Sequence, residues 1–218
     1  MTDDRTDQDL LQAHVDGDAD AFGELFTRHR DRLWAVALRT MGNPEDAADG
    51  LQDGMIAAFR RAGSYRGEAA VTTWLHRVVV NACLDRLRAA KIRRLDALPD
   101  DVEDRGTLVA TAVHDDQPDA AAEDSERRRR VLDALATLPA DQRAALVLVD
   151  MEGYPVAEVA EMLGCAEGTV KSRCTRGRTK LAGLLLDLHR PLGDPPHGNP
   201  PLDGPVQPIV RPRGPPAS

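Results

Sequence analysis

Residues 155–181 read PVAEVAEMLGCAEGTVKSRCTRGRTKL, and this stretch decides the fold of the C-terminal half of the chain. The apolar residues of its first part recur at the spacing of one helix face: Val156, Val159, Ala160 and Leu163. Gly164 then interrupts the pattern, and a second helix is predicted from about Glu167. Two short helices joined by a three-residue turn that contains glycine form a helix-turn-helix.

The second helix of this pair is predicted to present a polar and basic side to solvent. That side carries Glu167, Thr169, Lys171, Ser172, Arg173, Arg176 and Arg178, whereas Val170, Cys174 and Leu181 fall on the buried side. Residues 167–180 hold five bases and one acid, a net charge of +4. Arginine and lysine bind phosphates and guanine edges, and glutamate can accept from cytosine N4. DNA binding is the favoured interpretation, and an ordinary helical hairpin with a basic face is the alternative.

Upstream of this pair, the sequence predicts further helices and no strands. Helical spacing runs over residues 126–138 and is broken at Pro139, at residues 153–155 and at Gly164. Residues 95–125 show no sustained period, contain two prolines and many acids, and are predicted to form a flexible linker.

The N-terminal half also reads as consecutive helices. Residues 8–41 carry one apolar stripe after a break near Asp18, and Gly42 ends it. Asn43 and Pro44 are predicted to be the N-cap and first residue of the next helix. On one face of that helix lie Ala47, Leu51, Met55, Ala58 and Phe59, and we predict that Phe59 is buried there. After a loop over residues 63–71, Thr72 or Thr73 is predicted to cap a further helix.

We therefore predict an all-α protein with two small helical domains. The first covers residues 8–94 and the second residues 126–188, joined by the acidic linker of residues 95–125. The last 30 residues, 189–218, contain ten prolines and four glycines, so they cannot bury a core and are predicted to be disordered.

The distribution of charge favours nucleic acid as a partner, although the whole chain carries 28 bases and 36 acids, a net charge of −8. Residues 99–126 alone hold ten acids and one base, a net charge of −9. Residues 60–94 hold nine bases and two acids, a net charge of +7. Together with residues 167–180 they form two basic patches separated by an acidic stretch, which indicates two nucleic-acid contacts. Two solvated helix faces would give the same pattern.

Several other classes of protein are disfavoured by the sequence. No apolar run of about 18 residues and no signal peptide is present, so we expect a cytoplasmic protein that does not insert into a membrane. Cys83, Cys165 and Cys174 are odd in number and lack zinc spacing, so we expect no disulfide framework and no metal site. The chain has no Gly-rich phosphate loop or nucleophile–base set, so we expect neither an enzyme nor a cofactor or small-molecule substrate.

These motifs together carry a resemblance to a known family. The stretch over residues 138–181, LPADQRAALVLVDMEGYPVAEVAEMLGCAEGTVKSRCTRGRTKL, closely resembles region 4 of extracytoplasmic-function (ECF, group 4, sigma-70 family) RNA polymerase sigma factors. EDAADGLQDGMIAAFR (residues 45–60) resembles the core-binding helix of region 2, and SYRGEAAVTTWLHRVVVNACLDRLRAAK (residues 64–91) resembles its −10 recognition segment. Within that family, the amino-acid sequence is most similar to the SigM group.

The resemblance implies a face for docking on the clamp helices of the polymerase β′ subunit. The matching positions are Asp46, Asp49, Leu51, Gln52, Asp53, Met55 and Ile56. The local chemistry agrees, because residues 43–59 hold four acids, no base and interspersed apolar residues, which suits a basic and partly apolar partner. A solvated acidic helix face is the alternative. Gly50 and Gly54 depart from the bulkier residues usual in the family and are expected to weaken the helix, each by about 1 kcal/mol relative to alanine.

The resemblance also implies two DNA contacts. The −10 positions are Tyr65, Arg66, Trp74, Arg77, Asn81, Asp85 and Arg88, and the −35 positions are the seven polar residues of the second helix named above. The loop of residues 64–67 matches the one that accepts a flipped base, and Tyr65 could stack there. Trp74 could equally well pack into the core. With Phe59 in the buried stripe, only Tyr65 and Trp74 remain for DNA, which predicts weak melting and a need for near-matching promoters.

A sigma factor of this kind would bind core RNA polymerase, including its β flap, and promoter DNA. It would have no catalysis of its own. The family further implies an anti-sigma factor and a stress regulon, and a linker that threads toward the RNA exit channel. A linker that only keeps the chain soluble is an equally favoured alternative. The competing interpretation is a helix-turn-helix regulator whose residues 1–94 sense a ligand or dimerise. The second basic patch with Tyr65, Trp74 and Asn81 argues against it, because a sensor domain has no need of such a patch.

Overall fold

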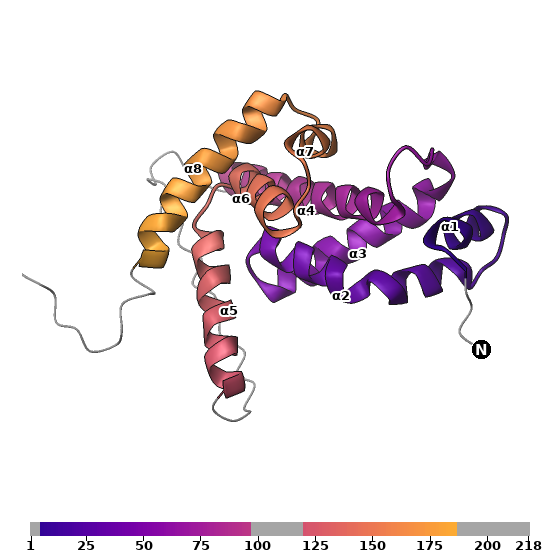
Figure 1. Cartoon of the computed structure of the whole chain (residues 1–218), viewed down its shortest axis with the longest axis horizontal. Coiled ribbons are helices and arrows are strands. Elements are labelled where there is room, and N and C mark those ends of the chain that lie inside the picture. The colour runs from indigo at the N-terminus through magenta and orange to yellow at the C-terminus, as the bar shows by residue number, and fades with distance from the viewer. Residues whose placement is uncertain (1–4, 97–119, 187–218) are drawn as a thin grey trace, which may run out of the picture.

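The computed structural model describes residues 5–96 and 120–186, and every regular element in these two ranges is helical (Figure 1). The all-α prediction is thereby confirmed. The N-terminal helices are α1 (Asp7–Val15), α2 (Ala21–Met41), α3 (Pro44–Arg61), a 3₁₀ turn η1 (Ala62–Ser64) and α4 (Val71–Asp96). The C-terminal helices are α5 (Ala120–Ala136), α6 (Ala140–Leu146), a π-helical segment η2 (Val147–Met151), α7 (Val156–Leu163) and α8 (Glu167–Leu186).

The helical parts extend beyond the predicted domain limits. Helix α4 runs two residues past residue 94, and α5 starts six residues before residue 126, so both enter the predicted linker over residues 95–125. The rest of that linker and the predicted disordered tail over residues 189–218 lie outside the described residues. Within the described ranges, no helix is both long enough and apolar enough to cross a membrane.

Local sequence signals account for most helix ends. Thr6 and Asp9 form a reciprocal capping box at the start of α1. Gly42 ends α2 in the left-handed conformation at φ 87°, where a side chain would be strained. Asn43 then accepts a hydrogen bond from the Asp46 backbone at 2.8 Å, with Pro44 as the first residue of α3, as predicted.

The predicted cap at Thr72 or Thr73 is wrong. Helix α4 begins at Val71, and the first backbone hydrogen bond of its entry runs from the Trp74 amide to the Ala70 carbonyl at 3.1 Å. Val71 and Thr73 are both buried. Both threonines therefore lie inside the first turn of the helix.

The core of the N-terminal domain is built from aliphatic side chains of α1 to α4. Leu10, Leu25, Leu33, Leu75 and Val79 are fully buried in one cluster. At roughly 1.5–3 kcal/mol for each buried side chain of this size, the cluster holds the four helices together despite the scarcity of aromatic residues.

Gly50 and Gly54 allow α3 and α4 to approach closely, which the sequence analysis did not foresee. A Cβ atom built on Gly50 would lie 2.8 Å from Cys83 Sγ, and one built on Gly54 would lie 2.9 Å from Val79 Cα. Real Cβ atoms essentially never come so near to other heavy atoms. The interpretation of these glycines as a simple weakness of the helix is therefore incomplete: they are required by the packing.

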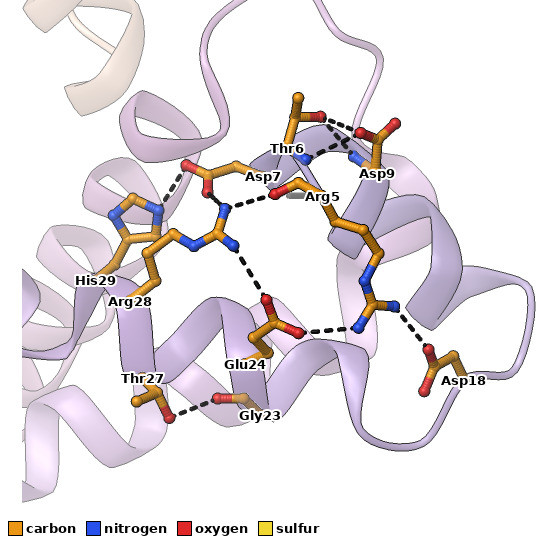
Figure 2. Close-up of polar contacts among 10 residues, drawn as sticks. All are labelled: Arg5, Thr6, Asp7, Asp9, Asp18, Gly23, Glu24, Thr27, Arg28 and His29. Carbon is orange, nitrogen blue, oxygen red and sulfur yellow. Dashed lines mark hydrogen bonds and ion pairs between the residues drawn. The ribbon is translucent and has the colours of Figure 1, made fainter. Parts of the chain in front are cut away.

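Helix α1 is fastened to α2 by a network of charged side chains (Figure 2). Arg28 donates to Asp7 at 2.8 Å and to Glu24 at 3.0 Å. Arg5 donates to the same Glu24 at 2.9 Å and to Asp18 at 3.0 Å. The network fixes α1 beside the turn η1, and so positions one wall of the loop that follows α3.

The C-terminal domain contains the predicted helix-turn-helix. Helices α7 and α8 are joined through Gly164, which adopts φ 61°. Val159, Val170 and Cys174 are buried between them and α6, as predicted for the inner side of the pair. Gly177 of α8 lies against Leu146, and a Cβ built on it would overlap Leu146 Cδ1, so α8 also depends on a close approach.

Candidate polymerase and nucleic-acid interfaces

The candidate polymerase-docking face of α3 is acidic and partly apolar at its surface. Gln52, Asp53 and Ile56 are exposed and Asp49 is half-buried, at the i, i+3, i+4 and i+7 positions of one helix face. Ile56 is 41% exposed, which is unusual for so large an apolar side chain. Arg86 of α4 pairs with Asp49, and with Asp53 at 3.1 Å, so two of the acids are tied to the α3–α4 packing.

Three of the seven predicted docking residues take part in core packing or helix capping and do not lie fully exposed on that face. Leu51 is only 8% exposed and lies in the core, so its side chain is not part of the exposed face that carries Gln52 and Asp53. Met55 is half-buried and packs against the same core. Asp46 is half-buried and accepts from the Asn43 side chain at 2.6 Å, so it serves the cap of α3.

The loop after α3 borders a pocket of about 230 Å³. The pocket lies between α1 and this loop, and its lining includes Gln8 and Gln12 on one side and Tyr65, Arg66 and Gly67 on the other. Tyr65 is half-buried, and its hydroxyl donates to the Ala69 carbonyl at 2.5 Å, which ties the loop to itself. Burial raises the pKa of Tyr65, so the phenol stays protonated at neutral pH. Arg66 is exposed at the rim.

The aromatic residues near this loop are arranged differently from the prediction. Trp74 is half-buried, packs on the core and lies 5.8 Å from the Tyr65 ring between centroids. Phe59 is 51% exposed, so its predicted burial is wrong. Its ring instead packs on His14 at 4.4 Å and on Phe22 at 5.2 Å, at the outer edge of the core. The statement that only two aromatic residues are accessible to DNA therefore fails, because Phe59 is a third.

The predicted −10 residues of α4 divide into exposed ones and ones that contact the C-terminal domain. Arg77 and Asp85 are exposed. Asn81 is half-buried, and its side-chain amide donates to the Met162 carbonyl of α7 at 2.9 Å. Arg88 pairs with Asp85 at 2.9 Å and approaches Asp141 of α6 at 3.5 Å.

The predicted −35 residues lie on the outer side of α8, but they differ in how exposed their side chains are. Glu167, Lys171, Arg176 and Arg178 are exposed, and Thr169 and Ser172 are half-buried. Lys171 pairs with Glu167 at 3.4 Å along the helix.

Two arginines of α8 are held by acids of their own domain. Arg173, predicted to be exposed, is half-buried and donates to Asp141 at 3.1 Å. Arg178 makes two hydrogen bonds to Asp150, at 2.9 Å and 2.6 Å. Arg176 makes only a 3.4 Å contact with Ser172 among the described residues, which leaves its guanidinium available to a ligand.

The two domains contact each other through residues that the sequence analysis did not single out. Glu152, which ends η2, has a side chain only 6% exposed and accepts from Arg32 at 3.1 Å and Arg39 at 3.0 Å, both on α2. Val36, Val80 and Leu84 of the N-terminal domain are buried in the apolar cluster of the C-terminal domain. Arg39 and Arg32 lie 113 and 120 positions from Glu152 in the sequence, so no local pattern could have revealed these two ion pairs.

A histidine–tyrosine pair completes this contact. The Tyr154 hydroxyl and His76 Nδ1 lie within hydrogen-bond distance at 2.7 Å, and the two rings meet edge to face. His76 is fully buried, and its Nε2 atom has no hydrogen-bond partner in the described part of the chain. Burial lowers the pKa of His76 to about 4, so the ring is neutral at physiological pH.

Among the described residues, no group of three or more His, Cys, Asp and Glu side chains could hold a metal ion. The three cysteines are free. Burial raises the pKa of Cys83 to about 12 and also raises that of Cys174, so both remain thiols at neutral pH.

Comparison with known proteins places both domains in one class. The family model for sigma-70 region 2 matches residues 25–92, and the model for sigma-70 region 4 matches residues 128–181. The first covers most of α2, all of α3 and most of α4, and the second covers the helix-turn-helix. The domains are those of a sigma-70 family transcription initiation factor, which is not an enzyme.

The curated relatives define the branch of this class. The chain is 51% identical to the ECF RNA polymerase sigma factor SigM of Mycobacterium tuberculosis over 183 residues, which cover 83% of this chain and 85% of that protein. It is 35% identical to the ECF RNA polymerase sigma-E factor of Haemophilus influenzae over 191 residues, covering 86% of this chain and all of the relative. The chain therefore belongs to the ECF RNA polymerase sigma factors.

Two solved structures have a similar fold. One is the sigma factor RpoE in complex with the anti-sigma factor NepR from Bartonella quintana, with a TM-score of 0.59, 26% identity and coverage of 79% of this chain and 100% of that one. The other is CnrH in complex with the cytosolic domain of CnrY, with a TM-score of 0.54, 27% identity and coverage of 84% and 99%.

Proposed function

We propose that this sigma factor divides its task among three surfaces of the described residues. The exposed face of α3, with Gln52, Asp53 and Ile56, docks on the polymerase clamp. The loop at Tyr65 and the exposed residues of α4 open and read the −10 element. The outer side of α8 reads the −35 element. The observation that supports this division is the separation of charge: an acidic and apolar face on α3, and basic faces on α4 and α8.

For the −10 step, we place the flipped base in the pocket between α1 and the Tyr65 loop. Its volume of about 230 Å³ suits a single flat base, and extrusion of a base needs stacking and contacts to its Watson–Crick edge. The ring of Tyr65 supplies stacking, and the carboxamides of Gln8 and Gln12 supply donors and acceptors. Arg66 at the rim supplies a cation for the adjacent phosphate.

For the −35 step, Lys171 and Arg176 are the side chains best placed to reach the major groove, because both are exposed on α8. Arg178 can contact phosphate once it leaves Asp150. Glu167 and Thr169 lie at the start of the helix, which is the end that meets base edges in a helix-turn-helix.

We also propose that an anti-sigma factor controls this chain in the cytoplasm and that it serves a stress regulon. The support is the family and the similar structure of the sigma factor RpoE in complex with the anti-sigma factor NepR.

The test is a promoter selection. The purified chain is combined with core RNA polymerase and a library of linear templates with randomised −35 and −10 segments, and the transcripts are sequenced. Recovery of two spaced motifs that require the chain supports the proposal. Binding to duplex DNA without polymerase, combined with no chain-dependent transcript, would instead indicate an ordinary helix-turn-helix regulator.

A further inference from the structure

The wall of the Tyr65 pocket that belongs to α1 presents a hydrogen-bond acceptor of fixed orientation. We infer that Gln12, oriented by Asp16, makes this pocket select a flipped base with an exocyclic amino group, which is adenine, cytosine or guanine, and reject thymine. This inference rests on the base-capture role proposed above for the pocket, and it names the class of base that the pocket accepts.

The orientation of the Gln12 side-chain amide follows from the chemistry of its partner. Gln12 Nε2 donates to Asp16 Oδ1 at 2.9 Å, one helical turn further along α1. A carboxylate only accepts hydrogen bonds, so the NH₂ group of the amide must face Asp16. The amide oxygen of Gln12 has no hydrogen-bond partner within residues 5–96 and 120–186. The group that Gln12 offers to a base in the pocket is therefore an acceptor.

Asp16 is itself held in place by the end of α1. It is the C-cap of the helix, and its backbone amide donates to the Gln12 backbone carbonyl at 2.9 Å. The other end of α1 is fixed by its capping box and by the ion pair between Arg28 and Asp7 at 2.8 Å (Figure 2). The pair of Gln12 and Asp16 thus stands on a helix that is anchored to α2, which keeps the acceptor in position before a base arrives.

The other polar side chains of the pocket do not select a base in this way. The Tyr65 hydroxyl donates to the Ala69 carbonyl, so its proton is not available to a base. Gln8 is exposed, and no hydrogen bond to another described residue fixes its amide, so it can present a donor or an acceptor to any base. Arg66 is exposed at the rim, where we place the phosphate. The selection of the base therefore depends on Gln12.

A fixed acceptor distinguishes the four DNA bases by the donors on their edges. Adenine, cytosine and guanine each carry an exocyclic NH₂ group, whereas thymine carries none. The one edge donor of thymine, N3–H, lies between two carbonyl oxygens, which repel a further acceptor. The hydrogen bond from a base amino group to Gln12 also becomes stronger once the base displaces water from the pocket, because the local dielectric constant falls.

The apolar lining of the pocket supports a base at the same place. Gln8, Gln12 and Val15 occupy the i, i+4 and i+7 positions of α1, so they share one face of the helix. Val15 is 45% exposed, which is unusual for an aliphatic side chain of this size. A base that packs on Val15 covers apolar surface that otherwise meets water. This face of α1 therefore offers both a contact area and an acceptor.

The first experiment locates the captured base. Holoenzyme is bound to the promoter recovered in the selection, with abasic sites placed one at a time in the non-template −10 strand, and open-complex formation is measured. At the position of the captured base, the abasic site should cancel the effect of Tyr65→Ala, because the two changes remove the two sides of one contact.

The second experiment removes the amino group at that position. The natural base is compared with thymine and with the analogue that lacks only the amino group, such as purine in place of adenine. Each replacement should lower open-complex formation by about three- to tenfold, as expected for the loss of one hydrogen bond.

Variants of α1 then test whether Gln12 causes this difference between the bases. Gln12→Leu should remove the difference, and Gln12→Glu, which keeps an acceptor, should retain it. Asp16→Ala frees the Gln12 amide to turn and should reduce the difference in part. The control is Asp20→Ala, which removes an exposed acid without a side-chain cap hydrogen bond at the start of α2 and should leave the difference unchanged. Binding to core polymerase and to a −35 duplex should be the same for all four variants, which shows that they fold.

The outcomes separate this inference from the proposed function. Thymine as the preferred base at the captured position, or equal opening with the natural base and its analogue, overturns the selection by Gln12 while base capture stands. A Gln12→Leu chain that keeps the full difference also overturns it. If Tyr65→Ala opens the promoter normally, or if no abasic site cancels its effect, base capture itself fails and the selection by Gln12 fails with it.

Discussion

Single side chains of this protein take part in more than one interaction. Arg173 and Arg176 look equivalent in the sequence, yet Arg173 is half-buried on Asp141 while Arg176 is exposed. Tyr65 lines a pocket, and its hydroxyl also donates to the Ala69 carbonyl within the loop. The consequences of replacing such residues differ from what their chemical type alone would predict.

Arg176→Ala should weaken binding of the holoenzyme to a −35 duplex. If Arg176 contacts a guanine in bidentate fashion, the loss amounts to roughly 1–3 kcal/mol and relaxes base preference at one position. Gel shifts with the recovered promoter and its single-base variants measure both effects. Arg30→Ala removes an equally exposed arginine from α2 and should change neither. Equal behaviour of the two variants would contradict the assignment of Arg176.

Tyr65→Ala should abolish promoter opening and leave core binding intact, because it removes the stacking surface of the pocket without touching α3. Permanganate reactivity of the −10 thymines reports opening, and a titration with core polymerase reports docking. Tyr65→Phe keeps the ring and loses only the bond to Ala69, so it should retain most of the opening. Normal melting by Tyr65→Ala would rule out base capture at this loop.

Cys174→Ser should destabilise the C-terminal domain by about 1–3 kcal/mol, since it places an unpaired hydroxyl in an apolar cluster. It should not alter the response to oxidants, because the buried Cys174 thiol has a raised pKa and is not the reactive thiolate. Urea unfolding tests the predicted loss of stability, and a peroxide challenge tests the predicted response to oxidants. The half-buried Cys165 offers a comparison through Cys165→Ser. A stable Cys174→Ser protein that had lost oxidant sensitivity would refute this view.

At the scale of helices, packing distance matters as much as helix propensity. Gly54 costs α3 about 1 kcal/mol in propensity, but its missing Cβ lets α4 come close. Gly54→Ala should therefore destabilise the protein by roughly 1–3 kcal/mol through overpacking against Val79. Thermal or urea unfolding measures this.

The matched control for that variant is Gly23→Ala on α2. A Cβ at Gly23 meets nothing within 4 Å, so this substitution should stabilise the helix by about 0.5–1 kcal/mol. A stabilising Gly54→Ala would show that α3 and α4 adjust freely and that the close approach is not a requirement.

Elements with local signals were predictable from the sequence, and those set by distant contacts were not. Gly42 and Asn43-Pro44 specify a helix end and start by themselves, and the Gly164 turn specifies the helix-turn-helix. The start of α4 was missed because the residue before its first turn is Ala70, whose side chain cannot act as a polar cap. Phe59 was predicted to be buried with the apolar stripe, but it lies near the end of α3, where its ring packs only on His14 and Phe22 at the outer edge of the core.

The candidate sites follow the same rule. The basic face of α8 could be predicted because every residue on it lies within one helix. The contacts of Asn81, Arg88 and Arg173 could not be predicted, because their partners belong to other helices. The hydrogen-bond partners of Arg173 and Asn81 lie 32 and 81 positions away in the sequence. The pocket beside Tyr65 depends on α1, which the sequence places more than 50 residues earlier.

At the scale of the whole molecule, the contact between the domains should depend on pH. Around buried His76 lie Tyr154, Glu152, Arg32 and His29, and burial is the main reason for its pKa of about 4 against an ordinary 6.5. Because the folded pKa is depressed, the stabilisation by neutral His76 is complete above about pH 6.5. This contribution to the free energy of unfolding declines as the pH falls toward 4, by about 3 kcal/mol in total.

A chain with fluorescent dyes on Thr27→Cys and Thr179→Cys, one exposed position in each domain, should therefore lose energy transfer between the dyes as the pH falls from 6.5 to 4. His76→Gln cannot be protonated and should flatten this dependence, whereas His14→Gln, at a half-buried histidine outside the contact, should not. A parent chain whose energy transfer does not change over this window would exclude His76 as the titrating group of the contact.

The two faces of the contact between the domains belong to one polypeptide, so their encounter is governed by a fixed effective concentration and not by the abundance of the protein. Dilution does not weaken this contact, and overproduction does not strengthen it. The share of chains in which the two domains are packed together is therefore the same at every concentration of the protein, and only a ligand that binds one arrangement better than the other changes it.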